Sequence, residues 1–200
     1  AEFTTVVGGN CTGLTVIESA VSNVFQGLEY QTIGDKEISS ITLLAATLGE
    51  KLRADGWKGL FGIDIIRDQE RNRIFFLEIN ARQPASTTFE SILQNENRTA
   101  GIPGETIFEA HLATLYNQPI TAPLIPINDG SQVIQRLTSK VHSFSAKTEK
   151  ALSDLGLTLI PYNNTDENSD LLRIQSRLGI MEIHGRFNTR GKEIVDTLLR

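Results

Sequence analysis

Two strand-like runs joined by a short polar turn form the clearest pattern of hydrophobic and polar positions in this chain. Residues 58–67 read Lys-Gly-Leu-Phe-Gly-Ile-Asp-Ile-Ile-Arg, and residues 73–82 read Arg-Ile-Phe-Phe-Leu-Glu-Ile-Asn-Ala-Arg. The linker 68–72 is rich in turn-forming residues, so the pattern predicts a β-hairpin that folds about Arg71. Strand alternation predicts that four side chains of the second run share one face: Phe76, Glu78, Asn80 and Arg82.

In this hairpin Asp64 is predicted to lie opposite Glu78 on the same sheet face. Two facing carboxylates repel each other, and a chain tolerates the pair readily when something positive lies between them. The oxygens of Asp64, Glu78 and Asn80 suit a hard divalent cation, and Mg²⁺ in such a site usually keeps waters and bridges phosphates.

The alternative is that these polar residues are only the solvent-facing side of a surface hairpin. The apolar character of residues 74–79 weighs against that interpretation. Glu78 and Arg82 would also lie ~13 Å apart along an extended strand at about 3.3 Å per residue, so they would not simply pair.

The rest of the first 118 residues predicts further elements around the hairpin. Strands are expected at 2–7 and 13–20, joined by a glycine-rich turn, with another strand at 28–33. An amphipathic helix is expected at 37–54 and a second helix at 104–116, on which His111 is packed or partly exposed rather than catalytic. Three side chains are expected to cap a helix beginning near residue 89, although the first two could instead donate to a phosphate or a carboxylate: Ser86, Thr87 and Thr88.

A proline-punctuated segment at 117–129 predicts a boundary, so we expect one domain at 1–118 and a second at 119–200. The second domain is predicted to have β-α-β-β-β-α order. Its expected elements are strands at 131–141, 157–162, 171–175 and 179–184 and helices at 147–155 and 191–200, with the last two strands as one hairpin. The fold class is α+β: an antiparallel sheet with flanking helices, followed by a small α+β domain.

Composition narrows the functional classes. The 200 residues are 40% hydrophobic and 22% charged, as in a soluble globular protein. The net charge of −5 argues against a nucleic-acid partner, and no apolar run reaches the ~20 residues of a membrane helix. The single Cys11 fits a reducing compartment, so we expect a cytoplasmic location.

Residues 56–68 followed by 75–82 resemble the metal-binding core of the ATP-grasp family. That family's pattern is a small-residue strand ending in an acid, a turn, and then Glu-x-Asn-x-Arg. The resemblance extends over residues 1–118 and is closest to the carbamoyl-phosphate-synthase-like and biotin-carboxylase-like branches. Four residues stand at the matching positions: Asp64, Glu78, Asn80 and Arg82.

The resemblance implies an ATP- and Mg²⁺- (or Mn²⁺-) dependent ligase that joins a small carboxylate to an amine, or forms a related C–N bond, through an acyl phosphate. Asp64, Glu78 and Asn80 would hold the metal ion, and Glu78 and Asn80 would also contact ATP through it. Arg82 would be the catalytic residue, a fixed forked donor for phosphate oxygens. Glu2 would match an acid near the ribose of ATP.

The resemblance also implies that part of the enzyme is missing. A glycine-rich loop, two lysines and a preceding lobe are expected upstream of Ala1, and the only methionine is Met181. We therefore expect the C-terminal half of an ATP-grasp domain plus an appended domain. It would be inactive alone, be completed in cis or by a partner chain in trans, and be able to form a homodimer. The alternative is a non-catalytic ATP-grasp-like module for interaction or regulation.

Overall fold

The computed structural model describes most of the chain and divides it into two compact units. One unit spans Ile33–Pro126, and the other combines Glu2–Thr32 with Ile127–Arg200. The turn predicted at 8–10 and the strand predicted at 28–33 lie outside the described residues. The structure describes residues 2–7, 14–21, 35–68, 71, 73–127, 129–139, 141–183 and 186–199.

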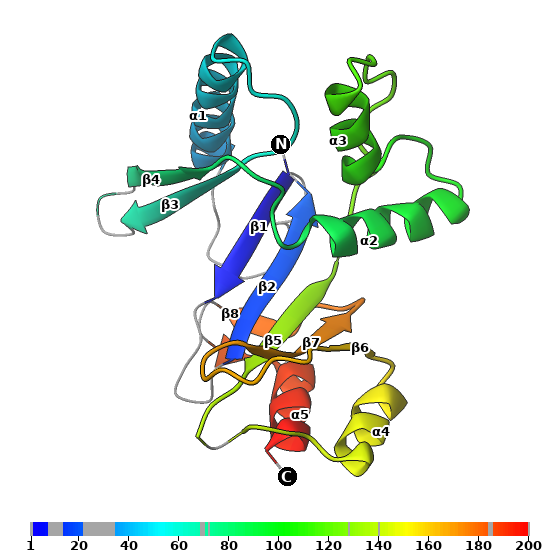
Figure 1. Ribbon diagram of the computed structural model, residues 1–200. Helices are drawn as coiled ribbons and strands as arrows, with labels where there is room; N and C mark the ends of the chain where they lie inside the picture. The colour runs from blue at the N-terminus through cyan, green and yellow to red at the C-terminus, as the bar shows by residue number, and fades with distance from the viewer. Residues whose placement is uncertain are drawn as a thin grey trace. The chain divides into compact units, whose positions relative to one another are not determined.

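The first unit is built around the predicted hairpin (Figure 1). Its antiparallel strands β3 and β4 follow helix α1, which packs against β4 through its apolar stripe and buries Ile41. Helices α2 and α3 follow the hairpin. The bounds of these elements are α1 Asp35–Ala54, β3 Gly62–Asp68, β4 Arg73–Asn80, α2 Thr87–Thr99 and α3 Ile107–Leu115.

Helix α3 begins at a capping box. The Thr106 hydroxyl accepts from the backbone N–H of Glu109, and the Glu109 carboxylate accepts from the backbone N–H of Thr106 at 2.8 Å. The side chain of Gln94, on α2, donates to the backbone oxygen of Ile125 and accepts from the backbone N–H of Ile107. The buried amide of Gln94 therefore links three parts of the unit by hydrogen bonds: α2, the start of α3, and the segment around Ile125 with which the unit ends.

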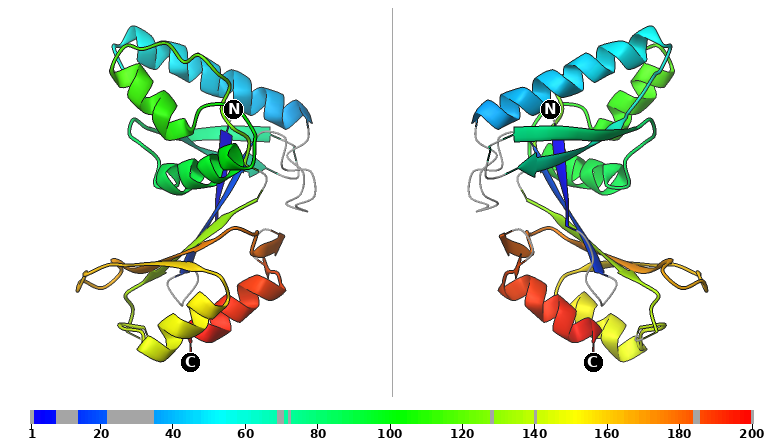
Figure 2. Two further views of the ribbon diagram at one scale, coloured as in Figure 1. Left: turned by 90° about the vertical axis from the view of Figure 1, so that its right-hand side faces the viewer. Right: turned by 90° about the vertical axis from the view of Figure 1, so that its left-hand side faces the viewer.

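The second unit contains a five-stranded antiparallel sheet in the order β1-β2-β5-β7-β6. Helices α4 (Ala146–Asp154) and α5 (Thr189–Leu198) lie on one face of it (Figure 2). The side chains of Leu172 and Ile174 form its core with Leu152 of α4 and Ile194 of α5. The strands are β1 Glu2–Val7, β2 Leu14–Val21, β5 Ser131–Arg136, β6 Thr158–Pro161 and β7 Asp170–Ser176.

The predicted hairpin between residues 171–175 and 179–184 is wrong. Strand β7 pairs with β5 and β6, whereas β8 (Met181–Ile183) pairs with β9 (Arg186–Phe187). Strand β5 also ends at Arg136 rather than at residue 141, because the chain turns there and the N–H of Thr138 donates to the oxygen of Val141. The two short strands β8 and β9 lead into α5.

The α+β fold class is confirmed: helices flank antiparallel sheets in the described chain. The pairing of β2 with β5 places β1 and β2 in the second unit, although the sequence assigned residues 1–118 to one domain. The domain boundary at residue 118 stays a prediction. None of the helices formed by the described residues has the length and apolar character needed to span a membrane.

The ion pair of Arg98 with Glu109 predicts a loss of stability in acid. Hydrogen bonds from Arg98 and from the N–H of Thr106 hold the pKa of Glu109 at about 2, below its ordinary value of 4.5. Since the pKa is lowered in the folded state, the ionised carboxylate stabilises the protein above about pH 4.5, and this contribution is lost as the pH falls towards 2. The two side chains are 35% and 47% exposed, so solvent screening keeps the contribution below ~1 kcal/mol.

Urea unfolding of wild type and Glu109→Gln at about pH 6 and about pH 3 measures this contribution. Wild type should be the more stable of the two at the higher pH, and the difference should shrink at the lower pH. A difference that does not change with pH would show that the Glu109 carboxylate does not contribute in this way.

Candidate functional site

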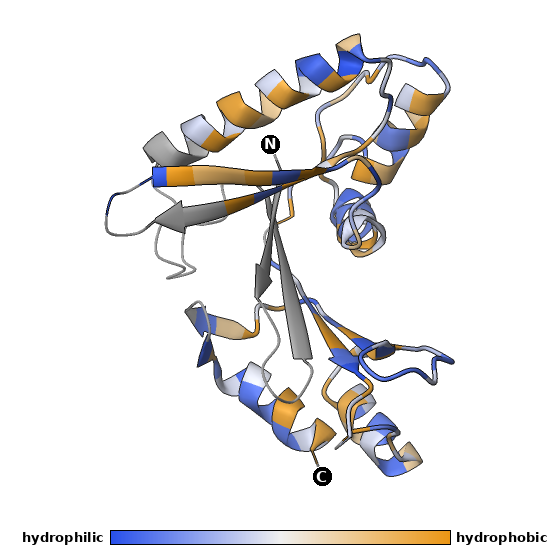
Figure 3. Ribbon diagram, turned by 60° about the vertical axis from the view of Figure 1, so that its left-hand side comes forward, coloured by the Kyte–Doolittle hydropathy of each residue, from blue (hydrophilic) through white to orange (hydrophobic). Residues whose placement is uncertain are grey.

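The hairpin brings the two predicted carboxylates opposite each other. Asp64 pairs with Glu78 across the β3–β4 ladder, which confirms the predicted register. The next pair is Ile65 with Phe76, so Leu77 has no partner and forms a β-bulge. Phe76 therefore follows Ile65 to the other side of the hairpin, and the prediction that it shares a face with Glu78 was wrong. Figure 3 shows β4 as a mainly hydrophobic strand.

The side-chain amide of Asn80 bridges the two carboxylates. Its Nδ2 donates to Oδ2 of Asp64 at 3.3 Å and to Oε1 of Glu78 at 3.2 Å. Both carboxylates are exposed to solvent and Asn80 is half-buried. One donor group thus holds both carboxylates at a single point, where the two negative charges would otherwise repel each other.

Arg82 completes the cluster by a turn of the backbone. Strand β4 ends at Asn80, and the N–H of Arg82 donates to the backbone oxygen of Asn80 at 2.8 Å. Nη2 of Arg82 then donates to Oδ1 of Asn80 at 3.3 Å. The prediction of an extended chain as far as Arg82 was wrong, and the turn returns the guanidinium to the cluster.

A histidine outside the predicted motif, His111 on α3, supports the start of β3. Gly59 has a φ of +100°, and a Cβ at this position would lie 2.6 Å from the imidazole of His111. Nδ1 of His111 accepts from the backbone N–H of Leu60 at 3.1 Å. His111 is therefore packed and hydrogen-bonded, as its sequence context predicted, and it fixes the strand that carries Asp64.

The loop after Arg82 differs from its prediction. Ser86 is the N-cap residue of α2, but its side chain makes no capping hydrogen bond, so the expected capping role was wrong. The neighbouring Thr87 is fully buried, and its hydroxyl has no hydrogen-bond partner among the described residues. The structure therefore gives no capping function to either residue.

The donor groups of the cluster fit a hard divalent cation. Two carboxylates and one amide supply oxygen atoms, the ligands that Mg²⁺ prefers, and their exposure leaves room for waters or phosphates to complete the coordination. Among the described residues, the hairpin included, no three His, Cys, Asp or Glu side chains come close enough to hold a metal ion, and the cluster supplies two of these residue types, Asp64 and Glu78, together with an amide. The amide group now lies where a cation would neutralise both carboxylates.

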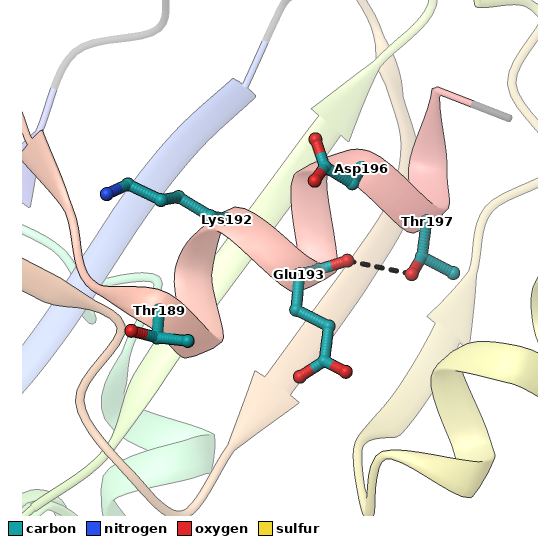
Figure 4. A pocket seen from close by; sticks show the side chains of 5 residues that line it. All are labelled: Thr189, Lys192, Glu193, Asp196 and Thr197. Atoms are coloured by element: carbon teal, nitrogen blue, oxygen red, sulfur yellow. Dashed lines mark hydrogen bonds between the residues drawn. The ribbon is translucent and has the colours of Figure 1, made fainter.

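Two other features belong to the second unit. Glu2 is on β1 in the second unit and its side chain is outside the described residues, so its contact with a ribose stays a prediction. A surface pocket lies along α5 (Figure 4). The hydroxyl of Thr197, one of its lining residues, donates to the backbone oxygen of Glu193 at 2.7 Å. The described lining of the pocket comes from one helix: Thr189, Lys192, Glu193, Asp196 and Thr197.

The similarity of this chain to known proteins lies in its fold. No protein-family model and no curated protein sequence matches it. The solved structure of carboxyaminoimidazole ribonucleotide synthase from Aspergillus clavatus, complexed with ATP, matches 98% of this chain with a TM-score of 0.56 and 17% identity. The phosphoribosylaminoimidazole carboxylase ATPase subunit from Aquifex aeolicus matches 100% of it, with a TM-score of 0.50 and 14% identity.

These matches define the class of fold. The chain shares the fold of part of the matched structures, the ATP-grasp fold that the hairpin motif predicted. It spans 46% and 50% of the length of the two matched structures. A third match is N5-carboxyaminoimidazole synthase from Aspergillus clavatus in complex with ADP and 5-aminoimidazole ribonucleotide, with a TM-score of 0.53, 15% identity, and coverage of 98% of this chain and 46% of that one.

Proposed function

We propose that this chain is the metal-binding half of an ATP- and Mg²⁺-dependent ligase that joins a small carboxylate to an amine or forms a related C–N bond. The observation that carries the proposal is the Asn80 amide between Asp64 and Glu78, which gathers three oxygen-bearing side chains at one point. The ATP-grasp fold around that cluster supports the assignment. The rest of the enzyme would come from a longer chain or from a cytoplasmic partner chain.

Each residue of the cluster has a defined part in this reaction. ATP, when bound, would supply the phosphoryl group that activates the carboxylate as an acyl phosphate, with ADP as the leaving group, and the cation would offset the charge on the phosphates. The amine would then attack the acyl carbon and displace phosphate. Asp64, Glu78 and Asn80 would hold the cation. Arg82 would bind phosphate oxygens through its forked donors and orient them. The protein needs no nucleophile of its own, since both attacking groups belong to substrates.

Calorimetric titration with Mn²⁺ tests the cation site. Wild type should bind one Mn²⁺ saturably, and Glu78→Gln should weaken that binding by at least about tenfold, because one of two charged ligands is lost. The matched control is Glu50→Gln, which removes the same charge from an exposed pair with Arg53 on α1 of the same unit. Equal Mn²⁺ affinity in the two variants would refute the metal site and favour the non-catalytic module.

A further inference from the structure

We propose that the Asn80 side chain is a positioning switch: cation binding reverses its amide and thereby releases Arg82 to bind an anion. This inference rests on the proposed metal site and extends it to the order in which ligands bind. It follows from three hydrogen bonds: those from Asn80 to Asp64 and Glu78, and that from Arg82 to Asn80.

The orientation of the amide without a cation is fixed by its partners. An ionised carboxylate can only accept hydrogen bonds, and a guanidinium can only donate them. The nitrogen of Asn80 must therefore face Asp64 and Glu78, and its oxygen must face Arg82. The opposite orientation would place the amide oxygen against two carboxylates and its N–H groups against a guanidinium.

A cation reverses these preferences. Its ligands in such sites are oxygens, and the side-chain amide nitrogen offers only N–H donors. For Asn80 to join Asp64 and Glu78 as a ligand, its oxygen has to turn to the side that its nitrogen now occupies. The N–H groups then face Arg82, which loses its acceptor and meets donors instead.

The surroundings allow this movement. Arg82 is exposed and follows a turn, so its guanidinium can leave without unpacking the core. The residue paired with Asn80 on β3 is Gly62, and a Cβ there would lie 3.7 Å from Cβ of Asn80. The residue directly opposite Asn80 on β3 therefore has no side chain that would obstruct the turn of the amide.

The functional consequence is ordered binding. Before the cation arrives, Arg82 is engaged by Asn80 and its forked donors are partly occupied. After the amide turns, the guanidinium is available to a phosphate or an acyl phosphate, the groups that a cation at this site would bring. By linkage, an anion that binds Arg82 also raises the affinity of the site for the cation.

The first test follows both side chains by ¹⁵N NMR during titration of the full chain with Mg²⁺. The side-chain NH₂ signal of Asn80 and the guanidinium signal of Arg82 should shift with one common midpoint in Mg²⁺ concentration. The two signals are identified by their loss in Asn80→Ala and in Arg82→Met. Movement of the Asn80 signal alone would overturn the switch but leave the metal site intact. Absence of any saturable shift would overturn both.

The second test is a double-mutant cycle on Mn²⁺ affinity. Arg82→Met removes a positive charge and should strengthen Mn²⁺ binding whether or not Asn80 is present. The switch is therefore measured by how much this strengthening differs between the wild-type background and the Asn80→Ala background. We expect the strengthening to be threefold to about tenfold larger with Asn80 present than in Asn80→Ala. Arg71→Met, at the hairpin tip, is the control for charge. Equal strengthening in both backgrounds would overturn the inference.

Discussion

Replacing Gly191 with alanine is expected to destabilise the second unit by about 3 kcal/mol or more. Gly191 lies in the first turn of α5, where its N–H donates to the side chain of Asn188. An added Cβ would lie 2.2 Å from the backbone oxygen of Ile180 and 2.7 Å from Cδ1 of Phe187. The oxygen of Ile180 already accepts from the N–H of Asn188, so neither the backbone nor the helix can move away without losing hydrogen bonds.

Urea unfolding followed by circular dichroism measures this effect, with Lys192→Ala as the control. Lys192 is the next residue of α5 and is exposed, so its truncation should leave the midpoint nearly unchanged. A Gly191→Ala midpoint equal to that of the control would mean that α5 does not pack on Ile180 as described.

Replacing Gln94 with leucine is expected to destabilise the first unit by about 2 to 6 kcal/mol. Gln94 is fully buried, and its amide satisfies the oxygen of Ile125 at 2.9 Å and the N–H of Ile107 at 2.7 Å. Leucine fills a similar volume but leaves both backbone groups buried without a partner, at about 1 to 3 kcal/mol each. The backbone N–H of Ile107, at the start of α3, would then lose its hydrogen bond to α2.

Asn95→Leu is the matched control, since it makes a similar change at the neighbouring, solvent-exposed position of α2. The fluorescence of Trp57, the only tryptophan, reports unfolding of the first unit in both variants. The midpoint should fall only in Gln94→Leu. Equal midpoints would show that the Gln94 hydrogen bonds do not stabilise the unit.

The sequence was sufficient to predict the hairpin and its facing carboxylates, because the residues that indicate them lie close together in the chain. Alternation and turn residues predicted the pairing of Asp64 with Glu78 within one short segment. The bulge at Leu77 and the turn at Arg82 were not predictable, because no residue type marks them. The failed Ser86 cap has the same cause: a serine before a helix permits a capping bond without requiring one.

The arrangement of the second unit could not be predicted for a different reason. Strand β2 pairs with β5, more than a hundred residues later in the chain, and the pairing of Ile17 with Gln132 leaves no local trace in either strand. Alternation identified the strands, but several pairings of them bury similar apolar faces. The assumption that sequence neighbours pair therefore failed for β7 and β8.

The bulge at Leu77 has a consequence for recognising related sequences. Asp64 would still pair with Glu78 if Leu77 were deleted, because Ile65 already pairs with Phe76. Such a deletion would make the ladder regular and keep both carboxylates opposite each other. The fourteen-residue interval from Asp64 to Glu78 is therefore not a requirement of the cluster. An alignment should allow a one-residue gap at this position, and a search with a fixed interval would reject chains that carry the same four side chains in the same places.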